Sequence, residues 1–259
     1  FWGNHFAISD KDFLAAFSTG PYQREIIRPN MVSTFEQMVK NVTTSWCMIH
    51  HLDNSESVGP LSKWGVQSRE TINENHAREL LELHTVSPEA GYSQDDVIQM
   101  TYVMTGWQHK WDSTRLETGD IWFNFETHQP NKKIILGKTY NPDGKRELFS
   151  VIKDLVYHPN CKKFIVTKLC RHFITDYPTD EMMNPIILAW EKSDGFLPEI
   201  HKAVVKAAFD YASTTSKFQQ PETWALQMVR MFGLYWIPKP DRMKYNFKTA
   251  PTNSQREIE

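Results

Sequence analysis

Residues 73–85 read Asn73-Glu74-Asn75-His76-Ala77-Arg78-Glu79-Leu80-Leu81-Glu82-Leu83-His84-Thr85. At about 100° per residue, a helix over this stretch separates its side chains into two faces. The polar face holds Glu74, Asn75, Arg78, Glu79 and Glu82. The apolar face holds His76, Ala77, Leu80, Leu81, Leu83 and His84. The stretch predicts an amphipathic helix whose apolar face packs on a core, and therefore a helical fold.

Helix signals continue on both sides of this stretch. A Ser or Thr followed three residues later by an acid is typical of a helix start, and it occurs at Ser9, Ser33, Thr71 and Ser93. Apolar residues at helical spacing predict further helices over about 146–157, 161–175, 197–211 and 221–232. The expected fold class is mainly α, a multi-helix orthogonal bundle.

One region departs from helical spacing. Ile121, Phe123 and Phe125 alternate with other residues, and a second short apolar run, 134–136, ends at Gly137. We expect a small β-hairpin or extended flap around residues 119–137. The sequence Asn-Pro-Asp-Gly at 141–144 predicts a turn, after which a helix restarts.

Composition limits the classes of function. The 259 residues carry 29 Lys and Arg against 31 Asp and Glu, a formal charge of −2, which provides no basic field for nucleic acid. No apolar run is long enough to span a bilayer. Three cysteines without C-x-x-C spacing indicate neither a disulfide framework nor a zinc ribbon. We expect one helical domain over residues 1–237 and an extended or mobile tail over 238–259.

The polar face of the helix over residues 73–85 has two interpretations. Glu74 with Arg78 and Arg78 with Glu82 are i,i+4 pairs, which favours a structural network of Glu74, Asn75, Arg78 and Glu82. Alternatively, Glu79 and Glu82 are i,i+3 carboxylates that could share a proton or position a water, with Arg78 orienting an anionic group. In the second case Glu79, Glu82 and Arg78 are the candidate catalytic residues.

A metal site is a less favoured hypothesis. The candidate ligands are His5, His84, His128 and Glu79, but Glu82 and His84 lie on opposite sides of a helix and cannot chelate one ion together. No H-E-x-x-H motif, cysteine cluster or calcium loop occurs. We therefore assign no metal ligands and predict no cofactor, with a divalent metal as the alternative.

A modest basic cluster lies near the end of the helix expected over 161–175. Lys168, Arg171 and His172 stand beside Asp176, and cations at a helix C-terminus complement the helix dipole. The sequence alone therefore explains this cluster as helix capping, without a ligand.

The order of motifs resembles the domain of unknown function 1800 family. The resemblance is carried by the phrase at 73–85 and, in the same order along the chain, by Phe1-Trp2-x-Asn4-His5-Phe6, Leu52-Asp53-Asn54, Gly91-Tyr92, Thr105-Gly106-Trp107, His158-Pro159, Lys168-Leu169-x-Arg171-x-Phe173 and Pro221-Glu222. From about Trp236 the sequence departs from the family's usual ending. The resemblance implies a mainly helical fold, an upstream helical region and export to the periplasm or the cell exterior. It also implies a phosphatase-like companion family as a possible partner.

Two functions remain open at this level. The favoured one is an exported helical scaffold or assembly protein that acts through protein–protein contacts; the nine tryptophans would supply partner surfaces if some are exposed. The alternative is a hydrolytic or metal-assisted enzyme that uses the Glu79, Glu82 and Arg78 face with a nearby histidine. The enzyme requires a pocket with convergent polar groups beside that face.

Overall fold

The computed structural model describes residues 1–9, 12–109 and 121–233. Within these ranges the chain is mainly helical, with two small antiparallel hairpins, which confirms the predicted fold class. The chain divides into two compact units, Phe1–Lys217 and Phe218–Glu259. The sequence predicts a single domain over residues 1–237, whereas this division falls after Lys217. The predicted tail, 238–259, and positions 119 and 120 of the predicted flap lie outside the described residues.

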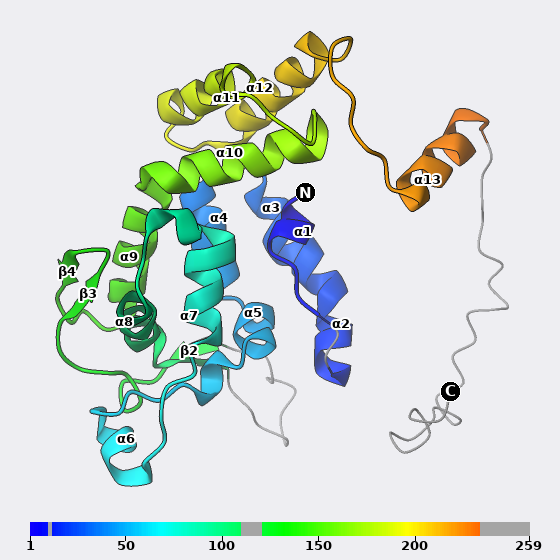
Figure 1. Cartoon of the computed structure of the whole chain (residues 1–259). Coiled ribbons are helices and arrows are strands. Elements are labelled where there is room, and N and C mark those ends of the chain that lie inside the picture. Colours follow the sequence, from blue (N-terminus) through cyan, green and yellow to red (C-terminus); the bar gives the residue numbers. More distant parts are fainter. Residues whose placement is uncertain (10–11, 110–120, 234–259) are drawn as a thin grey trace, which may run out of the picture. The chain divides into compact units, whose positions relative to one another are not determined.

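The first unit (Figure 1) begins with short helices and continues into longer ones. Its first half contains α1 (Trp2–His5), α2 (Phe13–Pro21), π-helical η1 (Tyr22–Ile27), α3 (Arg28–Asn30), α4 (Phe35–Thr43), α5 (Trp46–His51), the 3₁₀ turn η2 (Asn54–Glu56), α6 (Lys63–Ser68), α7 (Asn75–Glu79), π-helical η3 (Leu80–His84), the 3₁₀ turn η4 (Pro88–Ala90) and α8 (Gln94–Met104). After the strands come α9 (Lys145–Tyr157), α10 (Pro159–Phe173), α11 (Asp180–Lys192) and α12 (Leu197–Asp210). Helices α10, α11 and α12 pack against one another as one layer of the unit (Figure 1).

Where a Ser or Thr predicts a helix start, the observed N-terminus agrees with the prediction at α8 and differs by one or more residues at α4 and α7. Ser93 caps α8 as predicted, because its hydroxyl accepts from the Asp96 N–H while the Asp96 carboxylate accepts from the Ser93 N–H. At α4 the cap is Thr34, one residue after the predicted Ser33, because Thr34 takes the extended backbone conformation that a cap requires. The helix predicted from Thr71 begins at Asn75.

Both segments predicted to be extended contain strands. These two strands do not pair with each other, because each forms a hairpin with another strand. β2 (Ile121–Phe123) pairs with β1 (Trp107–His109), and β3 (Lys133–Ile135) pairs with β4 (Lys138–Tyr140). The second pairing follows from the turn at Leu136 and Gly137, whose φ angles are 48° and 75°. Two successive residues with positive φ are typical of a type I′ hairpin turn, which returns the chain at once.

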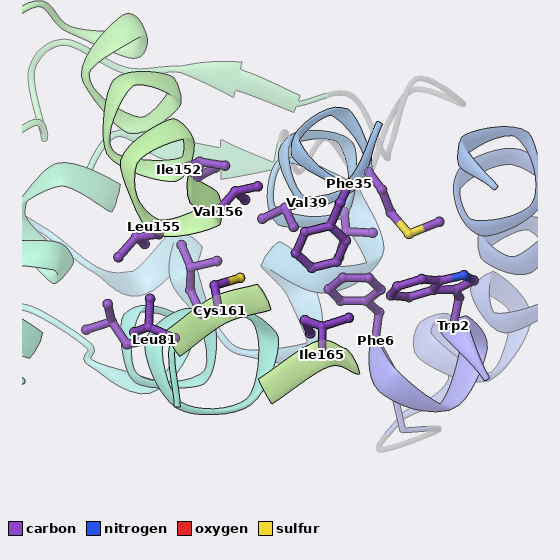
Figure 2. Close-up of a cluster of buried hydrophobic side chains, with 14 of the residues drawn as sticks. Trp2, Phe6, Phe35, Val39, Leu81, Ile152, Leu155, Val156, Cys161 and Ile165 are labelled. Atoms are coloured by element: carbon purple, nitrogen blue, oxygen red, sulfur yellow. The ribbon is translucent and has the colours of Figure 1, made fainter. Parts of the chain in front are cut away.

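The core of the first unit joins the start of the chain to its later helices. Figure 2 shows Trp2, Phe6 and Phe35 in a row, and the aliphatic side chains of α9 and α10 continue it. The ring centroids of Trp2 and Phe35 lie 5.6 Å apart, and those of Phe6 and Phe35 lie 6.3 Å apart. At about 25 cal/mol per Å² of apolar surface, burial of such aromatic side chains is a main source of stability.

The second unit is described only as far as residue 233. Its helix α13 (Pro221–Met231) begins with proline at its first position, as predicted, because that position needs no N–H donor. Along the described part of the whole chain, none of the helices has the length and apolar content needed to cross a membrane.

Candidate functional site

The predicted amphipathic helix is present as α7 continued by η3. Its apolar face is buried, with His76, Ala77, Leu80 and Leu81 in the core. Leu83 is the exception and is 45% exposed. Regular spacing places Leu83 on the apolar face, but residues 80–84 form a π-helix, whose wider turn rotates the later side chains out of that register.

The polar face forms a network that reaches a second helix. Arg78 donates to the Glu74 carboxylate over 2.7 Å and to the Gln94 side-chain oxygen over 2.9 Å. The Gln94 amide in turn donates to Glu74 over 2.9 Å. These bonds tie the start of α7 to the start of α8. Glu82 instead accepts a hydrogen bond of 3.3 Å from the Tyr92 hydroxyl.

The surroundings of Glu79, one of the candidate catalytic residues, shift the pKa of its carboxyl group. Burial raises the pKa of Glu79, the neighbouring Glu82 adds to the rise, and Arg78 opposes it. The two carboxylates therefore do interact, as their i,i+3 spacing predicts.

Two of the candidate metal ligands, His5 and His84, lie together, with ring centroids 6.1 Å apart. The Lys168 ammonium can only donate, so His5 Nδ1 accepts from it over 2.9 Å. His5 Nε2 then carries the proton and donates to the His84 carbonyl over 3.3 Å. Burial, followed by the charge of Lys168, holds the pKa of His5 well below its usual value, so this ring is neutral.

His128 belongs to a different buried cluster. Its Nδ1 donates to the Thr105 carbonyl over 2.7 Å, and its Nε2 lies 3.3 Å from Glu147 Oε2. The same carboxylate oxygen pairs with the Lys133 ammonium over 2.9 Å, and Lys133 also donates to the Gln129 carbonyl over 2.8 Å. Lys133 and Glu147 are each 1% exposed. The ion pair is thus almost fully removed from water.

The structure therefore does not gather the four candidate metal ligands into one place. His5 and His84 are neighbours, His128 lies with Glu147, and Glu79 is on the polar face of α7. Within residues 1–9, 12–109 and 121–233, no three His, Cys, Asp or Glu side chains are arranged to hold a metal ion.

A cleft of about 1080 Å³ adjoins the start of α7. Glu74 and Asn75 line it, whereas Arg78, Glu79 and Glu82 lie outside its lining. The rest of its lining comes from residues 55, 56, 58, 64, 70–73, 108, 124, 126 and 127. The cleft therefore lies between the start of α7, the loop before it, α6 and the β1–β2 hairpin.

Most amide groups of this cleft are used in building its walls. The Asn124 amide donates to the Gln108 side chain over 3.1 Å, and the Asn124 oxygen accepts from the Glu126 N–H over 3.0 Å. The Gln108 amide donates to the Ser55 carbonyl, and the Asn73 oxygen accepts from the Asn75 N–H. These hydrogen bonds fix the shape of the cleft and leave few amide atoms for a ligand.

The side chains of the cleft that remain available to contact a ligand are mainly carboxylates and the indole of Trp64. Trp64 is 46% exposed, and its Nε1 donates to Glu70 over 2.9 Å, which holds the ring beside that carboxylate. Glu74 pairs with Arg78 and Glu126 pairs with Lys63. Glu56 and Glu70 have no basic partner within the described ranges. The cleft thus presents unneutralised negative charge next to an exposed aromatic face.

The family model described as protein of unknown function (DUF1800) matches residues 1–256, almost the whole chain. The chain belongs to this family. The match extends past Trp236, where the sequence departs from the family's usual ending. No curated protein and no solved structure matches the chain.

Several residues of these sites were not identified from the sequence. Lys133 and Ile135 are two apart in a strand and share its inward face, so the alternation in residues 133–135 could have indicated a buried lysine. Nothing local marks Glu147 as its partner, because the two residues meet only when β3 packs near the start of α9. Trp64, Glu56 and Glu70 are likewise brought together only by the fold of the loops around α6.

Proposed function

We propose that this DUF1800 protein is a helical scaffold or assembly protein that binds a partner protein in the cleft beside α7. The partner presents a basic segment, and a Lys or Arg side chain lies against Trp64 between Glu56 and Glu70. The observation that carries the proposal is the exposed indole face flanked by carboxylates that lack basic partners.

A cationic ligand fits this cleft better than a neutral or anionic one. A cation over a tryptophan face gains about 0.5–1 kcal/mol at an exposed site, and tryptophan is the best aromatic for this contact. Nearby carboxylates add direct attraction and speed the encounter with a basic partner. The wall hydrogen bonds of Asn124, Gln108 and Asn73 already use most of the amide donors and acceptors that could bind a neutral ligand such as a sugar.

The compartment and the partner's family belong to the same proposal. The resemblance of the sequence motifs implies export, so we place the protein in the periplasm or outside the cell. The phosphatase-like companion family is the first partner to test, and a basic segment on its surface is the feature to look for.

The enzyme alternative has one observation in its favour, the raised pKa of Glu79 beside Glu82. A raised pKa keeps a larger fraction of a carboxyl group protonated near neutral pH, as a general acid requires. Catalysis would also need a cavity in which a substrate meets this carboxyl group. Because Glu79, Arg78 and Glu82 lie outside the lining of the cleft beside α7, we rank binding above hydrolysis.

The test is calorimetric titration of the full chain with two peptides of equal length, one containing several arginines and one with citrulline in their place. Only the arginine peptide should bind, and added salt should weaken its binding. The double variant Glu56→Gln with Glu70→Gln removes two ion pairs worth about 0.2–1 kcal/mol each, a roughly 2- to 30-fold loss of affinity. Gln at position 70 keeps an acceptor for Trp64.

The matched control is Glu89→Gln, an exposed carboxylate outside the cleft, which should leave the affinity unchanged. Equal binding of the citrulline peptide, or equal losses from the control and the cleft variants, would contradict the proposal. Tight binding of a neutral oligosaccharide in the same cleft would replace the protein partner with a glycan.

A further inference from the structure

A second, basic pocket lies in a different part of the first unit. It has a volume of about 300 Å³ and is lined by His5 of α1, by Lys168, Arg171 and His172 of α10, and by Lys217. Positions 168, 171 and 172 are three and four residues apart, so one face of α10 presents all three side chains. Three segments that are distant in sequence thus converge on one cluster of basic groups, and no acidic residue lines the pocket.

Lys168 has no counter-charge among the residues that the structure describes. The one hydrogen bond of its ammonium is to His5 Nδ1, and that ring is neutral because its proton is on Nε2, facing the His84 carbonyl. The Lys168 ammonium also lies 5.0 Å from the centre of the Phe164 ring. The side chain is partly buried, and burial lowers the pKa of Lys168. A cation taken from water without an anion is costly, so this group is poised for an anionic partner.

Arg171 is likewise without an acidic partner in the described part of the chain, whereas Lys217 pairs with Asp176 over 3.0 Å. The helix-capping explanation suggested by the sequence accounts for only part of this charge. A helix C-terminus carries an effective charge of about −0.5, which cannot balance two full positive charges. Two cations, Lys168 and Arg171, therefore remain uncompensated at the edge of one cavity.

We propose that the basic pocket binds a phosphate group. A phosphate monoester carries nearly two negative charges at neutral pH and so matches Lys168 and Arg171. The planar guanidinium of Arg171 can bind two phosphate oxygens at once, while the Lys168 ammonium, next to His5, contributes a point charge. The cavity holds such a group with some of its water, since one water takes roughly 30 Å³.

The phosphate can come from two sources. A mostly apolar groove of about 500 Å³ shares Phe1 and Asn4 with the basic pocket and continues to Phe173, Val205 and Phe209. A phosphate carried on an apolar group would fill both spaces, and free phosphate would fill only the basic one. The phosphate-binding groups, Lys168 and Arg171, are the same in both cases.

The test is a titration of the full chain with inorganic phosphate and, separately, with octyl phosphate, followed by calorimetry at constant ionic strength. Arg171→Gln should weaken the binding of both probes at least tenfold. Arg171 is exposed, so this variant should fold; Lys168→Met is the second variant. Lys163→Gln, an exposed lysine on the same helix outside the pocket, is the control and should change neither affinity.

If octyl phosphate binds more tightly than inorganic phosphate, and if Val205→Asp abolishes this difference in affinity, the ligand is a phosphate on an apolar group. Equal affinities would identify free phosphate. The proposal is overturned if neither probe binds, if Arg171→Gln leaves both affinities unchanged, or if Lys163→Gln weakens them as much.

Discussion

Replacing Lys133 with methionine tests the energetic role of the buried ion pair. The change keeps the length of the side chain but removes the ammonium that lies 2.9 Å from Glu147 Oε2 and 2.8 Å from the Gln129 carbonyl oxygen. Glu147 is then a buried carboxylate that has lost its ammonium partner and keeps only the His128 ring near its Oε2, and its Oε1 has no hydrogen-bond partner among the described residues. Breaking a buried pair from one side costs about 3–5 kcal/mol, a large part of the usual 5–15 kcal/mol of domain stability.

The double variant Lys133→Met with Glu147→Leu separates the ion pair from its surroundings. It removes both charges, so we expect it to lose less stability than Lys133→Met alone, because no uncompensated charge remains. Some loss persists, since the Gln129 carbonyl loses a donor, at about 1–3 kcal/mol for an unsatisfied buried group. A double-mutant cycle therefore gives a coupling that favours the pair by well over 1 kcal/mol.

The measurement is urea unfolding at pH 7 followed by circular dichroism, with the free energy of unfolding extrapolated to water. Lys132→Met is the control, because Lys132 is the exposed neighbour and should change stability by no more than about 0.5 kcal/mol. The reasoning is refuted if Lys133→Met costs less than about 1 kcal/mol or if the two single changes add without coupling.

Two further predictions concern buried histidines and a helix cap. Burial lowers the pKa of both His76 and His84 to about 3. Between pH 6.5 and 3 the unfolded chain therefore binds protons that the folded chain does not. As the pH is lowered through this range, the free energy of unfolding should decrease by up to about 1.4 kcal/mol per pH unit for each ring. His76→Phe removes a ring whose two nitrogens lack partners, so an unfolding series over this pH range should show a shallower slope, and an unchanged slope would contradict the assignment. Ser93→Ala should cost about 1 kcal/mol by losing the cap of α8, measured as a lower Tm, while a Tm within error of the parent would show that the cap contributes nothing.

The local elements of this protein were largely predictable because they depend on neighbours in the sequence. The helical spacing around residues 146–157 and 197–211 corresponds to α9 and α12 within one residue at each end. The apolar face of residues 73–85 is buried except at Leu83, where the π-helical turns of η3 change the register. That change depends on packing at the end of the helix and has no signature in the helical period.

Strand pairing and charge pairing were less predictable, because they join residues that are distant in the chain. The runs at 121–125 and 134–136 were predicted to be extended, and β2 and β3 overlap them, yet each partner strand is chosen by turn geometry and by packing on the helices. Similarly, i,i+4 spacing predicts the Glu74–Arg78 pair but gives no indication that Gln94 completes it or that Tyr92 binds Glu82.

The sequence by itself determined the family, the mainly helical class and the polar face of α7, since these depend on motif order and on a period of 3.6 residues. Only the tertiary structure decided which charges are balanced. It buries Lys133 against Glu147 and brings Lys168 against the neutral ring of His5. Within the described ranges it also leaves Glu56 and Glu70, in the cleft with Trp64, without basic partners. The physical reason is that the energy of a charge depends on its distance from other charges and from water, and folding sets both distances.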